Sequence, residues 1–438
     1  MAHDRLLELL LQFDPEQIEK VFGREFVLKP PDPTVALAPV KRVAIITEAF
    51  LPKIDGVSKT AFLTLNYLKQ TGREVLVFAP DISPDHIGDT RIIPLPSIGV
   101  FNVPETRMAL PNPIIARELH AFKPDLIHMF SPALMSVSGM ATGRHMNVPI
   151  VANYQTDLPG YAKHYGVTFA SELAHNWLRY VHNGCHLTLV PSKHTTRDLR
   201  DHGYKRLRYW GRGVDGERFN PNHRTQAMRD LLLNGRDPNS LLCVYVGRLA
   251  TEKCVDLLLG VAHLEGVSLT IVGDGAQRSE LEALFAGTNT FFTGYLLGDE
   301  LATAYASADV FLFTGPQETF GQVVQEAMAS GLPTVVTNQG GVKDLVVEGE
   351  SGFVVRSDTR EAFADAVRCL RDDPALRLHM STQARAIAES RPWEKVLAQL
   401  EDYYREALRI NDRFVRIYGH TDYHTNPARI AGALVGFE

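Results

Sequence analysis

Two glutamates flank a glycine-containing turn in the second half of the chain. Seven residues separate Glu318 from Glu326, and Gly321 lies between them. The apolar run 309–314 before the turn predicts a strand, and the pattern after Gly321 predicts a helix that contains Glu326. A helix start offers free backbone N–H groups to anionic oxygen, and carboxylates accept hydrogen bonds from neighbouring hydroxyls. These residues therefore favour a ligand with phosphates at one end and hydroxyl-rich rings at the other, as in a nucleotide sugar.

A second set of candidate residues is basic. It lies in the string Gly-Arg-Leu-Ala-Thr-Glu-Lys at 247–253, directly after the apolar run 241–246. Arg248 can bind a phosphate through two N–H groups, and Lys253 adds a flexible point charge. In a sugar-transfer reaction, two such cations can stabilise the charge that grows on a leaving diphosphate. The chain contains no Asp-x-Asp triplet, which holds a divalent ion in many sugar-transferring enzymes. We therefore expect no metal and no other cofactor.

The composition is that of a soluble globular enzyme with room for two domains. The chain has 438 residues, of which 45% are hydrophobic and 22% are charged. A net charge of −6 provides no overall attraction to nucleic acid. Four widely spaced cysteines predict neither disulfides nor a zinc site, and no apolar run approaches the roughly 20 residues of a transmembrane helix. The N-terminus lacks the pattern of a secretory signal, so we expect a cytoplasmic protein.

Short apolar runs alternate with helical patterns along most of the chain, which predicts parallel sheets with helices on both faces. The first series of expected strands comprises 42–47, 74–79, 125–129, 148–153 and 187–191. After breaks rich in Asn, Pro and Gly, the second series comprises 241–246, 267–272, 290–293, 310–313 and 333–336. We therefore predict an α/β protein with two doubly wound domains. Ligands bind beyond the carboxyl ends of the strands in such sheets, and we expect those ends to face a common cleft.

The segment with the two glutamates resembles the E-x7-E motif of retaining glycosyltransferases of family 4. The spacing alone is common in helices, but the longer string from Glu318-Thr-Phe-Gly to Glu326-Ala-Met-Ala-Ser-Gly-Leu-Pro is specific. The string at 247–253 is similar to the diphosphate-binding loop of the same family. The resemblance extends from about residue 41 to about residue 408. It implies the GT-B fold, in which two Rossmann-like domains face each other across a cleft and the last helix crosses back to the first domain.

This resemblance divides the chain into five parts. Residues 1–40 form an N-terminal extension, 41–220 an acceptor-binding domain and 221–392 a nucleotide-sugar-binding domain. Residues 393–410 form the crossing helix, and 411–438 form a C-terminal tail. The first part contains an imperfect helical pattern, which predicts either packing onto the main body or a helix that contacts a membrane surface or a partner.

In the second domain the resemblance assigns roles to most of the candidate residues. Arg248 and Lys253 match the cations of the diphosphate site, Glu318 matches the carboxylate nearest the donor sugar, and Glu326 matches the one that holds the ribose. Four further stretches are implied to bind the donor through backbone groups or beside the base: Thr319, Phe320 and Gly321; Gly273; Gly275; and Tyr295 in the base-binding turn 292–296.

In the first domain the implied residues follow the expected strands. Gly56 would let backbone approach the diphosphate, although Asp55 stands where the family often has another glycine. His128 resembles a family histidine near the anomeric carbon and is therefore a candidate catalytic residue. Gln155 stands where many relatives have histidine. An amide cannot carry a proton, so we expect Gln155, with Asp157, to orient the acceptor.

Arg212, in a string similar to the family's hinge, is expected either to reach the diphosphate or to tie the hinge. A basic run in the first domain predicts either a solvated face or a peripheral contact with anionic lipid headgroups. Its members are Lys193, His194, Arg197, Arg200, Lys205, Arg206 and Arg208.

The segment that contains Glu318 and Glu326 resembles in particular the GDP-mannose-dependent α-mannosyltransferases of actinobacterial lipid and lipoglycan synthesis. It implies metal-independent transfer of mannose to a lipid or glycolipid hydroxyl. The stretch 292–309 is also similar to sulfoquinovosyl-diacylglycerol synthases, which keeps transfer of a sulfoquinovosyl or glucosyl group from a UDP-sugar to diacylglycerol as an alternative. A nucleotide-sugar epimerase with the same fold and a binding module without activity are further alternatives. A dinucleotide oxidoreductase is disfavoured because Gly-x-Gly-x-x-Gly is absent after the first strand.

Overall fold

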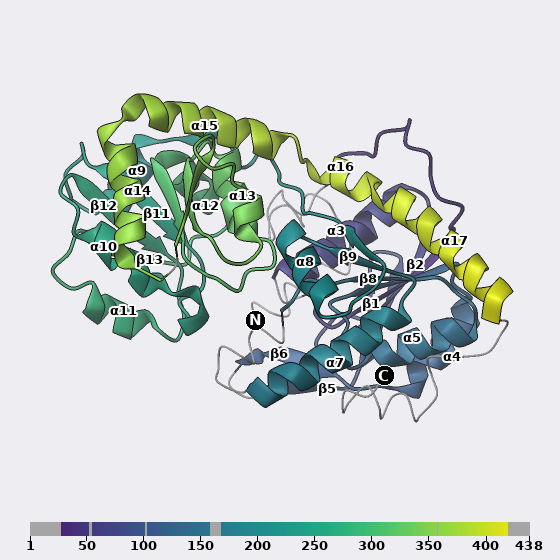
Figure 1. The fold of residues 1–438 in the computed structure, drawn as a ribbon. Coiled ribbons are helices and arrows are strands. Elements are labelled where there is room, and N and C mark those ends of the chain that lie inside the picture. Colours follow the sequence, from purple (N-terminus) through teal and green to yellow (C-terminus); the bar gives the residue numbers. More distant parts are fainter. Residues whose placement is uncertain (1–27, 52–54, 101–102, 158–167, 357, 419–438) are drawn as a thin grey trace. The chain divides into compact units, whose positions relative to one another are not determined.

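The computed structural model describes residues 28–51, 55–100, 103–157, 168–356 and 358–418. The chain divides into two compact units, one comprising Met1–Gly211 with Glu394–Glu438 and the other Arg212–Trp393 (Figure 1). The second unit thus starts at residue 212 rather than at the expected 221. The reason is that Val214 and Phe219 are buried in its core, and Val214 also forms a bridge with Pro392.

The first unit contains a sheet of eight strands that is parallel except at one edge. The spatial order of its strands is β10 (Leu207–Tyr209), β9 (Leu187–Val190), β8 (Ile150–Asn153), β7 (Leu126–Phe130), β1 (Arg42–Thr47), β2 (Glu74–Pro80), β4 (Thr90–Leu95) and β3 (His86–Ile87). The chain moves outwards from β1 through β2 and β4, then returns to β7 and continues outwards on the other side. The strand order therefore reverses between β1 and β7, which is where doubly wound sheets bind ligands. A separate hairpin joins β5 (Ser97–Val100) to β6 (Val103–Ala109).

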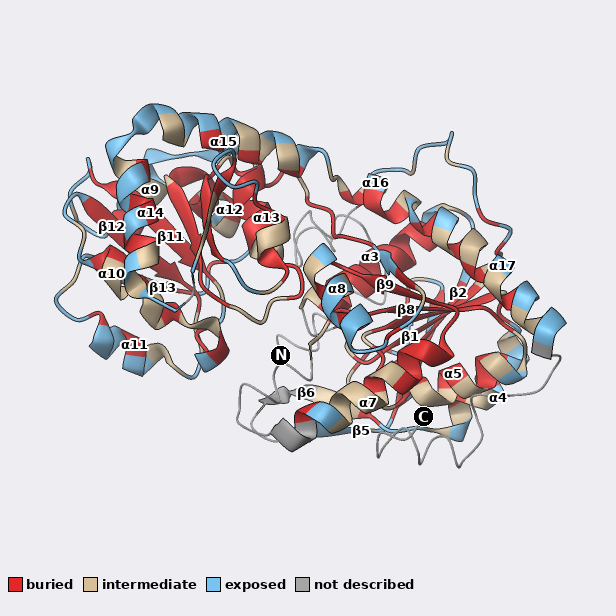
Figure 2. Ribbon diagram, viewed as in Figure 1, coloured by how far each residue is buried: buried red, intermediate tan, exposed pale blue. Residues whose placement is uncertain are grey.

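Helices cover both faces of this sheet because alternate strand residues point to opposite sides. Ala44 and Ile46 of β1 share one buried cluster with residues of α4 (Pro113–Phe122), α5 (Ser136–His145) and α7 (Thr168–Gly184). On the other face, α3 (Gly56–Gln70) lies against β1 and β2, and α17 (Leu400–Tyr418) lies against β8 and β9. The strands are accordingly buried along most of their length (Figure 2). Two further helices among the described residues are α8 (Lys193–Asp201) and α16 (Trp393–Ala398).

The second unit contains a parallel sheet of six strands. Their spatial order is β13 (Thr290–Gly294), β12 (Val267–Val272), β11 (Leu241–Val246), β14 (Val310–Phe313), β15 (Thr334–Thr337) and β16 (Gly352–Val355). The order reverses between β11 and β14, so the loops after these two strands border the switch point of this sheet. The prediction of two doubly wound α/β domains is confirmed.

Two clusters of buried residues cover the faces of the second sheet. Leu242 and Val244 of β11 belong to one cluster and Cys243 and Tyr245 to the other, as the alternation of a strand requires. Residues of four helices contribute to the first cluster: α9 (Gln226–Leu233), α12 (Gly298–Ser307), α13 (Gln322–Ala329) and α15 (Pro374–Glu389). Three others contribute to the second: α10 (Leu259–Ala262), α11 (Arg278–Leu284) and α14 (Arg360–Asp372).

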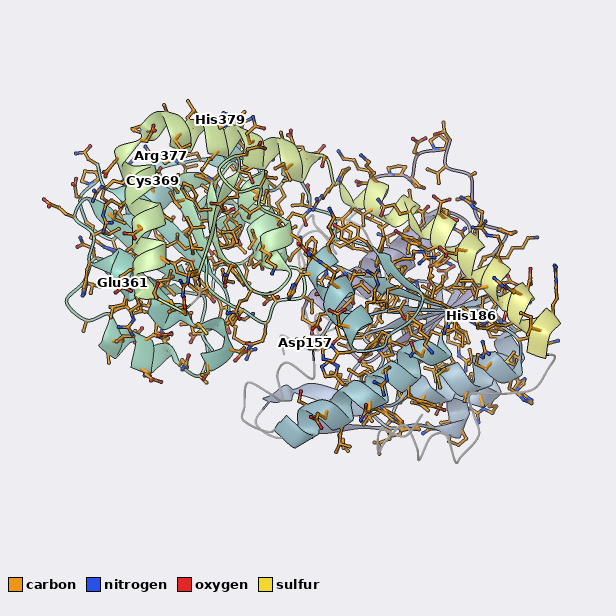
Figure 3. All side chains as sticks on the ribbon, in the orientation of Figure 1. Asp157, His186, Glu361, Cys369, Arg377 and His379 are labelled. Atoms are coloured by element: carbon orange, nitrogen blue, oxygen red, sulfur yellow. The ribbon has the colours of Figure 1, made fainter. Side chains whose placement is uncertain are left out.

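The last helix, α17, is longer than the sequence predicted, because it continues past residue 410 to Tyr418. Phe414 explains the extension: the guanidinium groups of Arg144 and Arg206 lie 5.2 and 5.5 Å from its ring centroid. The ring of His186, which is labelled in Figure 3, lies 5.6 Å from the same ring. Such cation–π contacts hold an aromatic ring against the sheet. The tail is therefore helical up to residue 418, and residues 419–438 lie outside the described part.

Residues 28–40 pack along the first unit without forming a helix or a strand. The backbone N–H of Ala38 donates to Glu401 of α17, and Arg73 forms a buried ion pair with the same carboxylate at 2.7 Å. These contacts fit the packing alternative for that part of the extension, whereas the predicted helix before residue 28 lies outside the described residues. Among the helices that the structure describes, none has the length and apolar character to cross a membrane.

Candidate functional site

The loops after β11 and β14 bring Lys253 and Glu318 into contact at the switch point of the second sheet. Lys253 ends the short 3-10 turn η3 (Thr251–Lys253), and its Nζ donates a hydrogen bond to Oε1 of Glu318. Thr314, the first residue after β14, donates through Oγ1 to the carbonyl of Lys253 at 2.6 Å. The two loops are thus fastened to each other by a side-chain ion pair and by a hydrogen bond to backbone.

Three cations act on the carboxylate of Glu318 through their charges. Burial alone would raise the pKa of Glu318, but the charge and hydrogen bond of Lys253, with the charges of Arg212 and Arg248, outweigh it. The pKa therefore lies below its usual value, and Glu318 is ionised at neutral pH. Four residues that the sequence singled out separately are close together in this unit: Arg212, Arg248, Lys253 and Glu318.

Arg248 is positioned by a residue that the sequence reasoning did not assign. Glu252, four residues further along in η3, is buried and accepts a hydrogen bond from Nη2 of Arg248. The Arg248 side chain remains 51% exposed, so its other N–H groups face solvent or a ligand. The i,i+4 spacing of Arg248 and Glu252 was the available signal, since oppositely charged residues at that spacing often pair.

The turn between Glu318 and α13 requires glycine at position 321. Gly321 adopts φ = 93°, which L-residues rarely adopt, and a Cβ there would lie 2.5 Å from Cγ1 of Val342. The first N–H groups of α13 consequently open onto the loop that carries Glu318. Phe320 and Thr319 are buried in this turn, and Glu326 is buried inside α13. The Arg212 guanidinium lies 5.9 Å from the centroid of the Phe320 ring.

A second glycine loop, which sequence reasoning missed, supports the backbone of Glu318. The N–H of Gly341 donates to the carbonyl of Glu318 at 2.6 Å. Gly340 has φ = 70°, and a Cβ on it would lie 2.6 Å from the carbonyl oxygen of Pro316. The adjacent glycines after β15 were the signal in the sequence, since paired glycines mark places where two backbone segments approach closely.

The glycines after β12 let their turn pack closely against the loop after β11. A Cβ on Gly273 would lie 2.0 Å from the carbonyl oxygen of Gly247, and one on Gly275 would lie 2.3 Å from that of Leu249. The neighbouring loop after β11 therefore excludes any side chain at these two positions, and the backbone contact to the nucleotide stays a prediction. Tyr295 is 64% exposed, and its hydroxyl donates to the carbonyl of Asp274 at 3.4 Å.

In the first unit, Gly56 is the first residue of α3. Asp55 is its N-cap, with Oδ1 accepting from the N–H groups of Val57 and Ser58, both at 2.9 Å. The aspartate that replaces a glycine of the family pattern thus starts the helix by satisfying its free N–H groups.

His128 is enclosed rather than placed at a strand end. It lies within β7 with no exposed surface, its Nδ1 is 2.9 Å from the hydroxyl of Tyr404, and its Nε2 is 3.0 Å from Oδ1 of Asn153. Burial lowers the pKa of His128 to about 4. The imidazole is therefore neutral, and both nitrogens are engaged within the unit. The expectation that His128 is catalytic is corrected: the ring links α17 to two strands of the sheet.

The segment after β8 carries both expected acceptor-binding residues. Gln155 is buried, and Asp157 accepts a hydrogen bond from the hydroxyl of Tyr154 at 3.3 Å (Figure 3). Between them, Oγ1 of Thr156 is 2.8 Å from Oγ of Ser131, which follows β7. The loops after β7 and β8 are thus joined beside the switch point of the first sheet.

Two members of the basic run are bound to groups of the protein. Arg206 donates to the backbone carbonyls of Asn183 and Cys185, and Arg208 pairs with Glu406 of α17. In the described ranges, no group of three or more His, Cys, Asp or Glu side chains is arranged to hold a metal ion. Independence from metal remains a prediction.

Comparison with known proteins agrees with these features. The family model described as "Glycosyltransferase Family 4" matches residues 54–218, and the model "Glycosyl transferases group 1" matches residues 233–387. A GDP-mannose-dependent alpha-mannosyltransferase of Mycobacterium tuberculosis is 39% identical over 84% of this chain and 97% of its own length. The sulfoquinovosyl transferase SQD2 of Arabidopsis thaliana is 34% identical over 84% of this chain and 74% of its own length.

Solved structures resemble the chain over most of its length. Sucrose-phosphate synthase from Thermosynechococcus elongatus aligns with a TM-score of 0.71 at 20% identity and covers 84% of this chain and 98% of its own. WaaG, a glycosyltransferase involved in lipopolysaccharide biosynthesis, aligns with a TM-score of 0.61 at 18% identity and covers 82% and 99%. With the two doubly wound units, these likenesses show the GT-B fold.

Proposed function

This chain belongs to glycosyltransferase family 4, and we propose that it transfers mannose from GDP-mannose to a hydroxyl group of a lipid or glycolipid acceptor, with retention of configuration. The observation that carries the proposal is the convergence of Arg212, Arg248 and Lys253 on Glu318 at the switch point of the second sheet. The relatives named as GDP-mannose-dependent alpha-mannosyltransferases support the choice of donor.

In this proposal the second unit binds the donor. The guanidinium groups of Arg248 and Arg212 and the ammonium of Lys253 bind the diphosphate and stabilise the charge that grows as the sugar leaves. Glu318 accepts hydrogen bonds from hydroxyls of the sugar, and Glu326 accepts them from the ribose. The N–H groups at the start of α13 add donors for sugar or phosphate oxygens.

The contact between Lys253 and Glu318 has a consequence for donor binding. Without donor, the ammonium of Lys253 is neutralised by the carboxylate of Glu318, so Lys253 does not hold an uncompensated buried charge. A bound diphosphate offers Lys253 a second anionic partner, while Glu318 gains hydroxyl donors in exchange. The leaving diphosphate is also the group that we propose helps the acceptor hydroxyl to lose its proton, since no carboxylate is assigned as a covalent nucleophile.

We place acceptor binding in the first unit, with Gln155 and Asp157 beside the incoming hydroxyl. No metal takes part in the proposed reaction, because the three cations supply the positive charge. The protein would act in the cytoplasm, at the membrane surface where a lipid acceptor resides, and nucleic acid is not a partner.

A specific observation favours one second candidate. The similarity to the sulfoquinovosyl transferase SQD2 covers the same share of the chain as the mannosyltransferase similarity. Transfer of a sulfoquinovosyl group to diacylglycerol would use the same cation cluster and differ in the base and sugar contacts.

Calorimetric binding of GDP-mannose, UDP-glucose and UDP-sulfoquinovose, with EDTA present, tests the proposal. We expect GDP-mannose to bind and Arg248→Ala to weaken that binding. The matched control is Arg356→Ala, which removes an exposed arginine of the same unit that pairs with Asp358. Preferential binding of a uridine donor would replace mannose transfer by the second candidate. Binding that is found only when EDTA is left out would contradict metal independence, and turnover of donor without any acceptor would identify an epimerase.

A further inference from the structure

A buried carboxylate, Glu48, lies directly after β1 and has no part in the function proposed above. Its side chain is 9% exposed. Oε1 accepts three hydrogen bonds, from the N–H of Ala133 at 3.0 Å and from the N–H and Oγ of Ser136 at 3.2 and 3.1 Å. Ala133 lies in the loop after β7, and Ser136 begins α5. Glu48 therefore fastens the loops on both sides of the switch point of the first sheet.

The second oxygen of this carboxylate has no partner. No hydrogen-bond donor of the described residues reaches Oε2 of Glu48, although the atom is buried. Burial raises the pKa of Glu48 to about 7, in spite of hydrogen bonding by Ala133, Ser136 and the backbone of Met135, which acts in the opposite direction. An unpaired buried polar atom costs free energy, so its persistence in a folded protein calls for a ligand, a water molecule or another cause.

A purely structural role explains only one of the two oxygens of the Glu48 carboxylate. All three observed hydrogen bonds go to Oε1, and the amide oxygen of a glutamine could accept them without burying a charge. The ionisable second oxygen adds cost and makes no hydrogen bond to the described residues of the unit. This imbalance is what a site for a hydrogen-bond donor on a ligand would produce.

The backbone beside Glu48 shows the strain that is common at binding sites. Ser131, the first residue after β7, has φ = 48°, which is rare for a residue other than glycine. Its side chain reaches Thr156 after β8, and the carbonyl of Ala133 accepts a hydrogen bond from Nε1 of Trp177 at 2.9 Å. The loop that carries the donors to Glu48 is thus held from three directions, which keeps the carboxylate in one orientation.

We propose that Oε2 of Glu48 accepts a hydrogen bond from a hydroxyl group of the acceptor, which makes Glu48 an acceptor-binding residue of this glycosyltransferase. The inference rests on the glycosyl transfer proposed above. Its ligand class is a headgroup with several hydroxyls, either a sugar or glycerol, because a hydroxyl can donate to the carboxylate when it is ionised and accept from it when it is protonated. The position at the switch point between β1 and β7 is where a doubly wound sheet binds its ligand.

Initial rates with two short-chain acceptors test this assignment and distinguish the two sources of hydroxyl. GDP-mannose is the donor, and octyl α-D-mannoside and dioctanoylglycerol are the acceptors. We expect Glu48→Gln to raise the KM of the productive acceptor about tenfold, the equivalent of one hydrogen bond to a charged group, and to leave the KM of GDP-mannose within about twofold. Glu48→Asp, which keeps the charge but withdraws it by one methylene, should also raise the acceptor KM.

Glu118→Gln is the matched control, because Glu118 is a buried carboxylate on α4 that pairs with Arg91 and Arg117 instead. An unchanged acceptor KM in Glu48→Gln, or equal changes in both KM values, would overturn the assignment. A wild-type protein that binds GDP-mannose but transfers to neither probe would overturn the acceptor class. A wild-type protein that does not bind GDP-mannose at all would overturn the proposed function itself, together with the role of Glu48.

Discussion

Replacing Glu48 by glutamine should stabilise the first unit at alkaline pH and have a smaller effect in mild acid. The folded state raises the pKa of Glu48 from 4.5 to about 7. Between these values the folded protein holds the proton and the unfolded chain does not, so the stability contributed by Glu48 falls as pH rises. It is fully present below about pH 4.5 and lost above about pH 7.

The difference between the pKa of Glu48 in the unfolded chain, 4.5, and in the folded protein, about 7, corresponds to about 3 kcal/mol of folding stability, at about 1.4 kcal/mol per pKa unit. Because proton binding is coupled to folding, about 2.5 kcal/mol of this stability is lost as the pH rises from about 5 to about 8.5. Glutamine keeps the acceptor for Ala133 and Ser136 but carries no charge at any pH. The stability of Glu48→Gln relative to wild type should therefore rise by about 2.5 kcal/mol over that range.

Hydrogen exchange measured by mass spectrometry on peptides from β1 and β7 reports the opening free energy of this unit. Relative to wild type, protection in the variant should increase about 70-fold from about pH 5 to about pH 8.5, after correction for intrinsic exchange rates. Glu118→Gln should show little change over the same range, because arginine pairing keeps the pKa of Glu118 below its usual value. If the ratio of protection between Glu48→Gln and wild type were the same at both pH values, the reasoning would be refuted.

Three other outcomes are expected. Arg248→Ala should lower kcat by about 10²–10³-fold, because a donor to the leaving diphosphate is lost, and normal turnover in steady-state assays would contradict that role. The ring of His128 should show no titration by NMR between about pH 5.5 and about pH 8, since burial lowers its pKa to about 4, and a midpoint near neutrality would restore it as a proton carrier. Glu401→Gln should destabilise the first unit by about 3–5 kcal/mol in urea unfolding, because Arg73 loses its buried partner; a change below about 1 kcal/mol would show that the pair is dispensable.

Local patterns in the sequence were sufficient for the fold and for the donor cluster. The strands 42–47, 241–246, 267–272 and 310–313 match β1, β11, β12 and β14 in full, because buried parallel strands are continuous apolar runs. The strands that were missed, such as β10 and β16, are short and partly exposed, so their composition does not differ from that of loops. Motif and strand-end position together also placed Arg248, Lys253 and Glu318 at the same edge of one sheet.

These sequence patterns did not predict how far individual residues are buried or whether they are charged. His128 follows an apolar run as a catalytic histidine might be expected to, yet Tyr404, 276 positions away, closes one side of its ring. The sequence did not predict a role for Glu48, because a single carboxylate after a strand is a common feature of sequences. Its importance depends on donors 85 and 88 positions away and on the absence of one for its second oxygen among the described residues.

The sequence by itself determined which segments form strands and helices, which loops follow the strand ends and to which family the chain belongs. Those properties depend on neighbours within a few residues, whose periodicity and turn chemistry are visible in the chain. Only the tertiary structure decided that Lys253 pairs with Glu318, that Gly273 and Gly275 serve loop packing, and that His128 is enclosed. Desolvation, pairing and steric space are set by segments far apart in sequence, and so they exist only once the chain has folded.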